Sequence, residues 1–157
     1  MGNGVDHLPM EPSRYPVPPG LRPSRGLVGI HRLAAAEPDS LGPPIYQLYV
    51  LEVEDPLAVV PYDFYVGVTK ESPEKRRAIH AKGGLYAAAM FKRDGVTPGP
   101  LRPDLTQGLP RFRCRVCAEN AEGRLARVIA TQLGPAHSDQ LANRRKGSTL
   151  PCEGRRT

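Results

Sequence analysis

Residues 64–80 read Phe-Tyr-Val-Gly-Val-Thr-Lys-Glu-Ser-Pro-Glu-Lys-Arg-Arg-Ala-Ile-His, and they predict a strand that runs into a helix. The first five residues are aromatic or β-branched around one glycine, which is typical of a short buried strand. Ser72 is a preferred N-cap residue, and Pro73 suits the first helical position because no intrahelical partner is needed there. Arg76 and His80 lie four residues apart, so we expect them to share one helix face.

An earlier strand is predicted at residues 45–53, where apolar residues occupy both alternating sets. A break at residues 54–56 and a short link separate this segment from residue 64. Two strands joined in this way most economically pair antiparallel, which would bring Tyr49 and Tyr65 into one sheet. Taken alone, these side chains also fit two ordinary core tyrosines whose hydroxyl groups are hydrogen-bonded.

The rest of the chain predicts a short series of elements. The helix that starts at Pro73 should end near Gly83-Gly84. Turn-forming residues fill the segment between the second helix and the next strand, and the final helix carries a core-facing apolar stripe with Glu122 at its edge. In order, we expect a helix at 85–92, a loop at 96–109, a strand at 111–117 and a helix at 118–133.

The spacing Cys114-x-x-Cys117 is also found in zinc and redox sites, so such a site is an alternative to the strand. A structural zinc site needs four ligands, and the remaining candidates, Cys152, His137 and His80, have no recognisable spacing. In the predicted strand, residues three apart point to opposite faces. We therefore favour the strand over metal binding at this pair.

Composition indicates one small domain with flanking segments. The 157 residues include 18 prolines and 16 glycines, no tryptophan and only 6% aromatics, which limits the size of the core. We expect a mostly disordered leader at 1–43 with one short strand or helical turn, a folded domain at 44–136 and a basic disordered tail at 137–157.

The formal charge is +6 with a pI near 9.5, which suits a polyanion partner without requiring one. No apolar run approaches the ~20 residues that a membrane-spanning helix needs. No secretory signal is visible, and the three cysteines are an odd number, so we expect reduced thiols in a cytoplasmic protein.

Several segments together resemble the GIY-YIG nucleases. The family's second motif and arginine helix match Tyr65-Val66-Gly67 and Glu74-Lys75-Arg76-x-x-x-His80. Tyr49 stands where the first motif has its tyrosine, although the glycine and isoleucine of that motif are absent. Ala118, Glu122 and Leu125 match the helix that carries the family's metal-binding glutamate. Gly83-Gly84 and residues 101–105 resemble a small bacterial branch, and the resemblance covers roughly residues 45–134.

This resemblance implies an α+β fold with a small antiparallel or mixed sheet of about three strands flanked by helices. It also implies a metal-dependent endonuclease that hydrolyses phosphodiester bonds in DNA. Mg²⁺ or Mn²⁺ would be held by Glu122 with water, and no small-molecule cofactor would be needed. The oligomeric state stays open.

The implied catalytic residues are Tyr49, Tyr65, Arg76, His80 and Glu122. Tyr65 would act as general base or orient water with Tyr49 as its partner, Arg76 would contact the phosphate, and His80 would share proton transfer or orient phosphate. From their charge alone, we expect Lys75, Arg77 and Arg102 to contact the DNA backbone.

Two alternatives stay open. One is a basic module of the same fold that binds nucleic acid without cutting it. The missing Gly-Ile of the first motif and the shortened C-terminal edge of the domain favour this alternative. The other is a small domain that acts through protein partners bound to its flanking segments. The two tyrosines, Arg76, His80 and Glu122 favour the enzyme, because a protein that only binds needs no acid facing phosphate.

Overall fold

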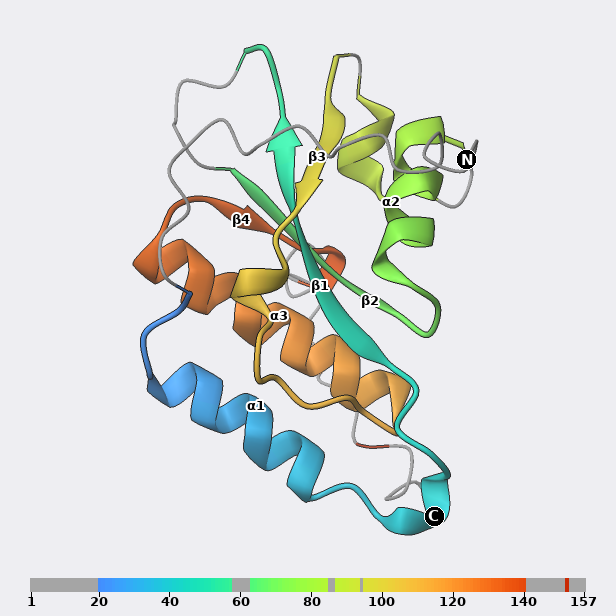
Figure 1. The fold of residues 1–157 in the computed structure, drawn as a ribbon, viewed down its shortest axis with the longest axis vertical. Coiled ribbons are helices and arrows are strands. Elements are labelled where there is room, and N and C mark those ends of the chain that lie inside the picture. The colour runs from blue at the N-terminus through green and yellow to red at the C-terminus, as the bar shows by residue number, and fades with distance from the viewer. Residues whose placement is uncertain (1–19, 58–62, 85–86, 94, 141–151, 153–157) are drawn as a thin grey trace, which may run out of the picture.

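A four-stranded sheet with helices on both faces forms the centre of the protein (Figure 1). The structure is a computed structural model that describes residues 20–57, 63–84, 87–93, 95–140 and 152. The strands are β1 (Gln47–Glu54), β2 (Phe64–Thr69), β3 (Thr97–Leu101) and β4 (Ala136–His137). The helices are α1 (Arg25–Ala35), α2 (Pro73–Lys82) and α3 (Arg115–Gln132), with short 3-10 helices η2 (Asp39–Leu41), η3 (Ala89–Lys92) and η4 (Pro103–Leu105). The predicted α+β class is confirmed, but the sheet has four strands rather than about three.

The sheet has the order β3-β1-β2-β4. β1 pairs antiparallel with β2, as predicted, with Tyr49 opposite Gly67 and Leu51 opposite Tyr65. β4 pairs parallel with β2, but only at Phe64 and Tyr65. The edge of β2 beyond Tyr65 therefore has no neighbouring strand on that side in the described part of the chain.

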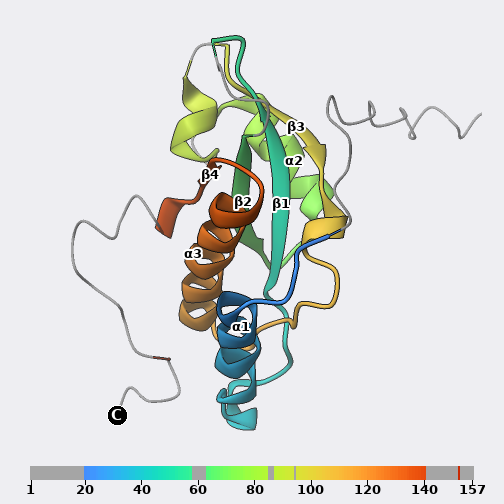
Figure 2. The same ribbon diagram turned by 90° about the vertical axis from the view of Figure 1, so that its left-hand side faces the viewer.

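Helices cover the two faces of the sheet, and Figure 2 shows the sheet between α2 and α3. On one face, Val50 and Val66 pack in a core with α1 and α3 residues such as Ile30 and Leu125. On the other face, Tyr49 and Tyr65 belong to a second cluster with residues before and within η3. Both faces of β1 are buried, as its apolar pattern predicts.

α2 begins and ends where its sequence predicts. The Ser72 hydroxyl accepts the backbone N–H of Lys75 at 3.2 Å, and Pro73 is the first helical residue. Gly83 ends the helix with a left-handed φ of 64°, a conformation that glycine adopts without steric cost. Residues 85–86 lie outside the described part, and within residues 87–92 the helical segment is Ala89–Lys92, of the 3-10 type. The predicted α-helix there is not found in residues 87–92.

The predicted loop at 96–109 instead contains β3 and η4. β3 pairs antiparallel with β1 at the edge of the sheet. Its sequence is rich in proline, which an edge strand tolerates because only one side needs ladder hydrogen bonds. A Cβ at Gly99 would lie 3.0 Å from the Glu52 carbonyl oxygen, so glycine allows the close approach to β1.

The predicted strand at 111–117 is wrong, because α3 already begins at Arg115. Only Phe112 makes a strand-like contact, an isolated antiparallel bridge to Tyr46. The Glu37 carboxylate accepts the backbone N–H groups of Arg113 and Cys114, and the Cys114 sulfur caps α3. These side chains satisfy the backbone in place of a sheet partner.

The flanking segments are also more ordered than predicted. In the leader, α1 packs against α3 and places Ile30 in the core with 0% exposure, while residues 1–19 lie outside the described part. Burial of such a side chain stabilises the fold by roughly 1.5–3 kcal/mol and so contributes to the folding of this segment. In the tail, β4 includes His137, whose Nε2 lies 2.6 Å from the Asp63 carboxylate. None of the described helices is both long and apolar enough to cross a membrane.

Candidate active site

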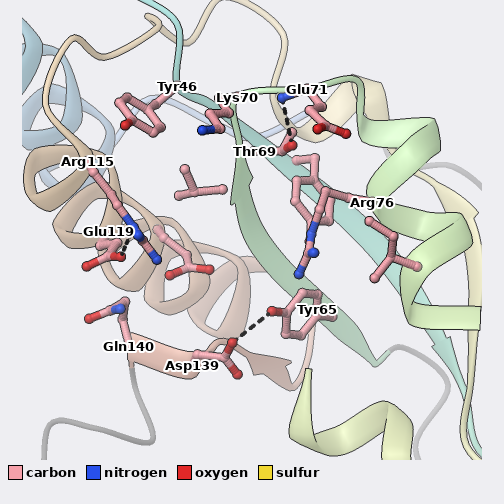
Figure 3. A pocket seen from close by; sticks show the side chains of 14 residues that line it. Tyr46, Tyr65, Thr69, Lys70, Glu71, Arg76, Arg115, Glu119, Asp139 and Gln140 are labelled. Carbon is pink, nitrogen blue, oxygen red and sulfur yellow. Dashed lines mark hydrogen bonds and ion pairs between the residues drawn. The ribbon is translucent and has the colours of Figure 1, made fainter. Parts of the chain in front are cut away.

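A pocket of about 450 Å³ opens beside the uncovered edge of β2 (Figure 3). Its walls come from β1, β2, α2, α3, the residues next to these elements and residues 139–140 after β4, so no single segment of the sequence forms it. The charged and polar lining residues are Tyr46, Tyr49, Tyr65, Thr69, Lys70, Glu71, Arg76, Arg115, Glu119, Glu122, Asp139 and Gln140. Four of the five predicted catalytic residues are among them: Tyr49, Tyr65, Arg76 and Glu122.

The spacing of polar residues on α3 explains how this helix reaches the pocket. Arg115, Glu119 and Glu122 recur four and three residues apart, so they lie on one face of the helix. Arg115 and Glu119 form an ion pair of 3.0 Å on that face. The adjacent stripe, which includes Ala121 and Leu125, is fully buried against the sheet. The helix face that carries Arg115, Glu119 and Glu122 therefore lines the pocket at the edge of the core.

The glycine of the Tyr-Val-Gly segment has a steric reason in this structure. Gly67 lies directly opposite Tyr49 in the β1–β2 pair, and a Cβ at position 67 would overlap the phenol ring of Tyr49. The ring can therefore lie flat over the neighbouring strand. Its centroid is 6.3 Å from that of Tyr65, so the two phenols share one face of the sheet.

His80 does not line the pocket, and its ring instead contacts the Tyr49 hydroxyl. The backbone N–H of Ala88 donates to Nδ1 at 3.0 Å, so this nitrogen carries no proton in the neutral ring. The ring proton is then on Nε2, which lies 2.7 Å from the Tyr49 oxygen and donates to it. Burial and the nearby charge of Arg76 lower the pKa of His80 to about 4. His80 is only 1% exposed and is thus a positioning residue rather than a proton carrier.

His80 and Arg76 both influence the Tyr49 hydroxyl. His80 donates a hydrogen bond to its oxygen, and the positive charge of Arg76 acts on its pKa. Burial raises the pKa of Tyr49, and Arg76 opposes that rise. Because the Tyr49 oxygen accepts the Nε2–H of His80, its own O–H remains available to another partner.

Tyr65 connects β2 to the residues that follow β4. Its hydroxyl donates to the Asp139 carboxylate at 3.3 Å, a contact that Figure 3 shows across the pocket. Burial raises the pKa of Tyr65, and the nearby Tyr49, Glu122 and Asp139 raise it further. Tyr65 therefore stays a neutral phenol unless positive charge enters the pocket.

Glu122 is the buried acid of the site. It is 5% exposed yet lines the pocket, so its carboxylate faces the cavity rather than open solvent. Burial raises its pKa well above the usual range, the negative charges of Asp139 and Glu119 add to this rise, and Arg76 opposes it. Because its pKa is raised, any cation that enters the pocket stabilises the ionised form of Glu122.

The pocket offers oxygen donors of the kind that a hard divalent cation such as Mg²⁺ or Mn²⁺ prefers. Its carboxylate donors are Glu122, Glu119 and Asp139, and oxygen ligands are those that magnesium prefers. These carboxylates do not form a tight cluster of three, since the sole such cluster in the described residues consists of cysteines. One or two carboxylates with several water molecules match the usual coordination of Mg²⁺.

The predicted DNA-contacting residues differ in their placement. Lys75 is exposed near the start of α2. Arg77 instead donates to the carbonyl oxygens of Gly99 and Pro98 at 2.7 and 3.2 Å, so it links α2 to β3.

Arg102 is buried and forms no part of the pocket wall. It is 3% exposed and makes two hydrogen bonds of 3.0 Å to Asp104, and its guanidinium lies over the Phe64 ring. This placement corrects the expectation of a backbone contact with DNA: the arginine supports the fold.

The pocket also contains four polar residues that were not predicted from the sequence: Lys70, Arg115, Glu119 and Asp139. Asp139 lies in the segment that we expected to be a disordered tail, and no motif marks it. Glu119 had a usable signal, because it stands three residues before Glu122 and so shares its face of the helix. Arg115 was assigned to a strand that does not form.

The chain matches no family model, no curated protein and no solved structure.

Proposed function

We propose that the protein is a metal-dependent endonuclease of the GIY-YIG type, which hydrolyses phosphodiester bonds in DNA. The observation that carries this proposal is the pocket shared by Glu122, Arg76 and two phenols, which come from four different elements. A buried acid that faces a guanidinium across a cavity suits a cation and a phosphate bound together. The net charge of +6 supports a polyanionic substrate.

Each residue has a role that follows from its surroundings. Glu122 would hold Mg²⁺ or Mn²⁺, which when bound supplies charge to polarise the phosphate and assist the leaving oxygen. Arg76 would bind the scissile phosphate with its planar fork. Tyr49, held by His80, would direct its O–H toward the substrate or its water.

Tyr65 would accept the proton of the attacking water. Because its hydroxyl already donates to Asp139, it can pass its own proton to that carboxylate as it receives one. The phenol then need not exist as a free phenolate, which its raised pKa disfavours. Asp139 would release the proton to solvent from its exposed position.

The test is the conversion of supercoiled plasmid to nicked and linear forms, with Mg²⁺ and with chelator. We expect nicking that needs the metal and that Glu122→Gln reduces by at least ~100-fold while DNA binding persists. Glu54→Gln is the matched control, since Glu54 is an exposed acid at the end of β1 away from the pocket.

The same experiment separates the enzyme from a module that only binds. Gel retardation of DNA by the wild-type protein without nicking in Mg²⁺ or Mn²⁺ would support the binding module. Nicking that survives in Glu122→Gln at the wild-type rate would exclude this pocket as the active site.

A further inference from the structure

Three cysteines from two distant parts of the chain meet beside the start of α3. The sulfur atoms of Cys114, Cys117 and Cys152 all lie within 4.8 Å of one another. Cys114 and Cys117 are 0% and 4% exposed, and Cys152 is half-buried against the same core. Cys152 is also the one residue of 141–157 that the structure describes.

The start of α3 accounts for the orientation of the first two thiols. Cys114 is the N-cap residue, and its sulfur accepts the backbone N–H of Cys117 at 3.4 Å. A spacing of three residues places both side chains on one side of the first helical turn. The strand expected here would have separated them.

The geometry suits a metal better than a disulfide. A disulfide joins two sulfur atoms and would leave the third thiol of this cluster unused. In a tetrahedral zinc site, Zn–S distances of about 2.3 Å place the ligand sulfur atoms about 3.8 Å apart. The sulfur atoms here lie within 4.8 Å, so a contraction of at most about 1 Å would complete such a site.

We propose that Cys114, Cys117 and Cys152 bind a thiophilic divalent cation, namely Zn²⁺. Water on the half-exposed side of Cys152 completes the tetrahedral coordination. This site goes beyond the proposed nuclease activity and does not depend on it. Its soft sulfur ligands also select a different metal from the oxygen-lined pocket, so the two sites do not compete for the same ion.

The proposed site has a structural consequence for the pocket. Zinc there would attach the C-terminal segment to the first turn of α3 through Cys152. Arg115 lies between the two α3 cysteines and pairs with Glu119, both of which line the pocket. Zinc would therefore fix the helical turn that presents these two charges.

The first test measures zinc in the full-length protein. The reduced protein is stripped with chelator, loaded with Zn²⁺, desalted and analysed for metal and free thiols. We expect about one zinc per chain, which excess Mg²⁺ does not displace. Cys152→Ser should lower the zinc retained at least tenfold, because it removes a ligand without changing the buried part of α3. Glu122→Gln is the matched control and should retain zinc like the wild type.

The second test uses Co²⁺ as a spectroscopic substitute for Zn²⁺. We expect sulfur-to-cobalt charge-transfer absorption and intense visible bands of a tetrahedral site in the wild type, and their loss in Cys152→Ser. The thermal midpoint should rise with Zn²⁺ only in proteins that keep all three cysteines. The proposal is overturned if the reduced wild type retains no zinc, or if Cys152→Ser retains as much as the wild type. Nicking activity bears on neither result, so this proposal and the nuclease proposal can fail separately.

Discussion

The phenol ring of Tyr49 occupies the space that a side chain at Gly67 would fill on the neighbouring strand. The ring is 2% exposed, and its oxygen lies 2.7 Å from the Nε2 of His80. A glycine on β2, a tyrosine on β1 and a histidine on α2 thus depend on one another for their positions. Together, the three residues fix the position of the Tyr49 ring beside the pocket.

Gly67→Ala should displace the Tyr49 ring. The added methyl group overpacks a buried site, so we expect a loss of roughly 1–3 kcal/mol in the free energy of unfolding. Nicking should fall at least about tenfold, because the hydroxyl leaves its place beside His80. Urea unfolding and plasmid nicking measure the two effects. Gly84→Ala is the control, since a Cβ at Gly84 meets nothing within 4 Å. Equal behaviour of the two variants would contradict this account of the ring.

The stability of the protein should depend on pH through His80. Burial and Arg76 lower the pKa of His80 in the folded state from 6.5 to about 4. The unfolded chain therefore takes up a proton first, so stability is full above about pH 6.5 and is lost as the pH falls toward 4. His80→Gln removes this loss. Between pH 7 and pH 4, the difference in unfolding free energy between the two proteins should change by on the order of 2–3 kcal/mol. A difference that stays constant across this range would show that the ring is not held neutral.

Glu122 should reduce stability at neutral pH in the absence of a cation. Its pKa is raised in the folded state by burial, Asp139 and Glu119, so the unfolded chain ionises first and stability falls as the pH rises above about 4.3. In chelator at pH 7, Glu122→Gln should be more stable than the wild type by on the order of 1–2 kcal/mol. Mg²⁺ should stabilise the wild type and so reduce the difference in stability between the two proteins. Urea unfolding with and without Mg²⁺ is the measurement, and a variant that is less stable in chelator would refute the prediction.

Asp139→Asn should weaken catalysis without unfolding the protein. The amide cannot take a proton from Tyr65 and brings no negative charge to the pocket, so we expect nicking to fall roughly 10²-fold or more. The Mg²⁺ concentration for half-maximal nicking should also rise. Asp39→Asn is the control, because the Asp39 side chain is 99% exposed on η2. Unchanged kinetics in Asp139→Asn would remove Asp139 from the proposed proton path.

Substitution of Arg102 should lower the stability of the protein, whereas substitution of Lys75 should weaken DNA binding. Arg102→Ala removes the partner of Asp104 from a buried site and should cost roughly 3 kcal/mol of stability. Lys75→Ala should stay within about 0.5 kcal/mol of the wild type. Its effect should appear in DNA binding, where the slope of log affinity against log salt should become shallower by about 1. Chemical unfolding and salt-dependent fluorescence anisotropy report the two quantities. A stable Arg102→Ala protein with weakened DNA binding would restore the expectation drawn from charge.

Local patterns predicted the elements that depend on neighbouring residues. Ser72, Pro73 and Gly83 mark the ends of α2 because capping and left-handed conformations involve only a few adjacent residues. The predictions failed where a distant partner decides the structure. β3 is a strand because β1 pairs with it, and residues 113–114 turn into α3 because Glu37 accepts their N–H groups.

The sequence by itself determined two apolar strands, the capped helix after them and a last helix with an acid beside its apolar stripe. These follow from side-chain periodicity and capping, which act over a few residues. The tertiary structure alone decided that Glu122 faces Arg76 and the two phenols, that Asp139 reaches Tyr65 and that Arg102 is buried. These contacts depend on strand register and on β4 ending after two residues, because both are set by packing between segments far apart in the chain.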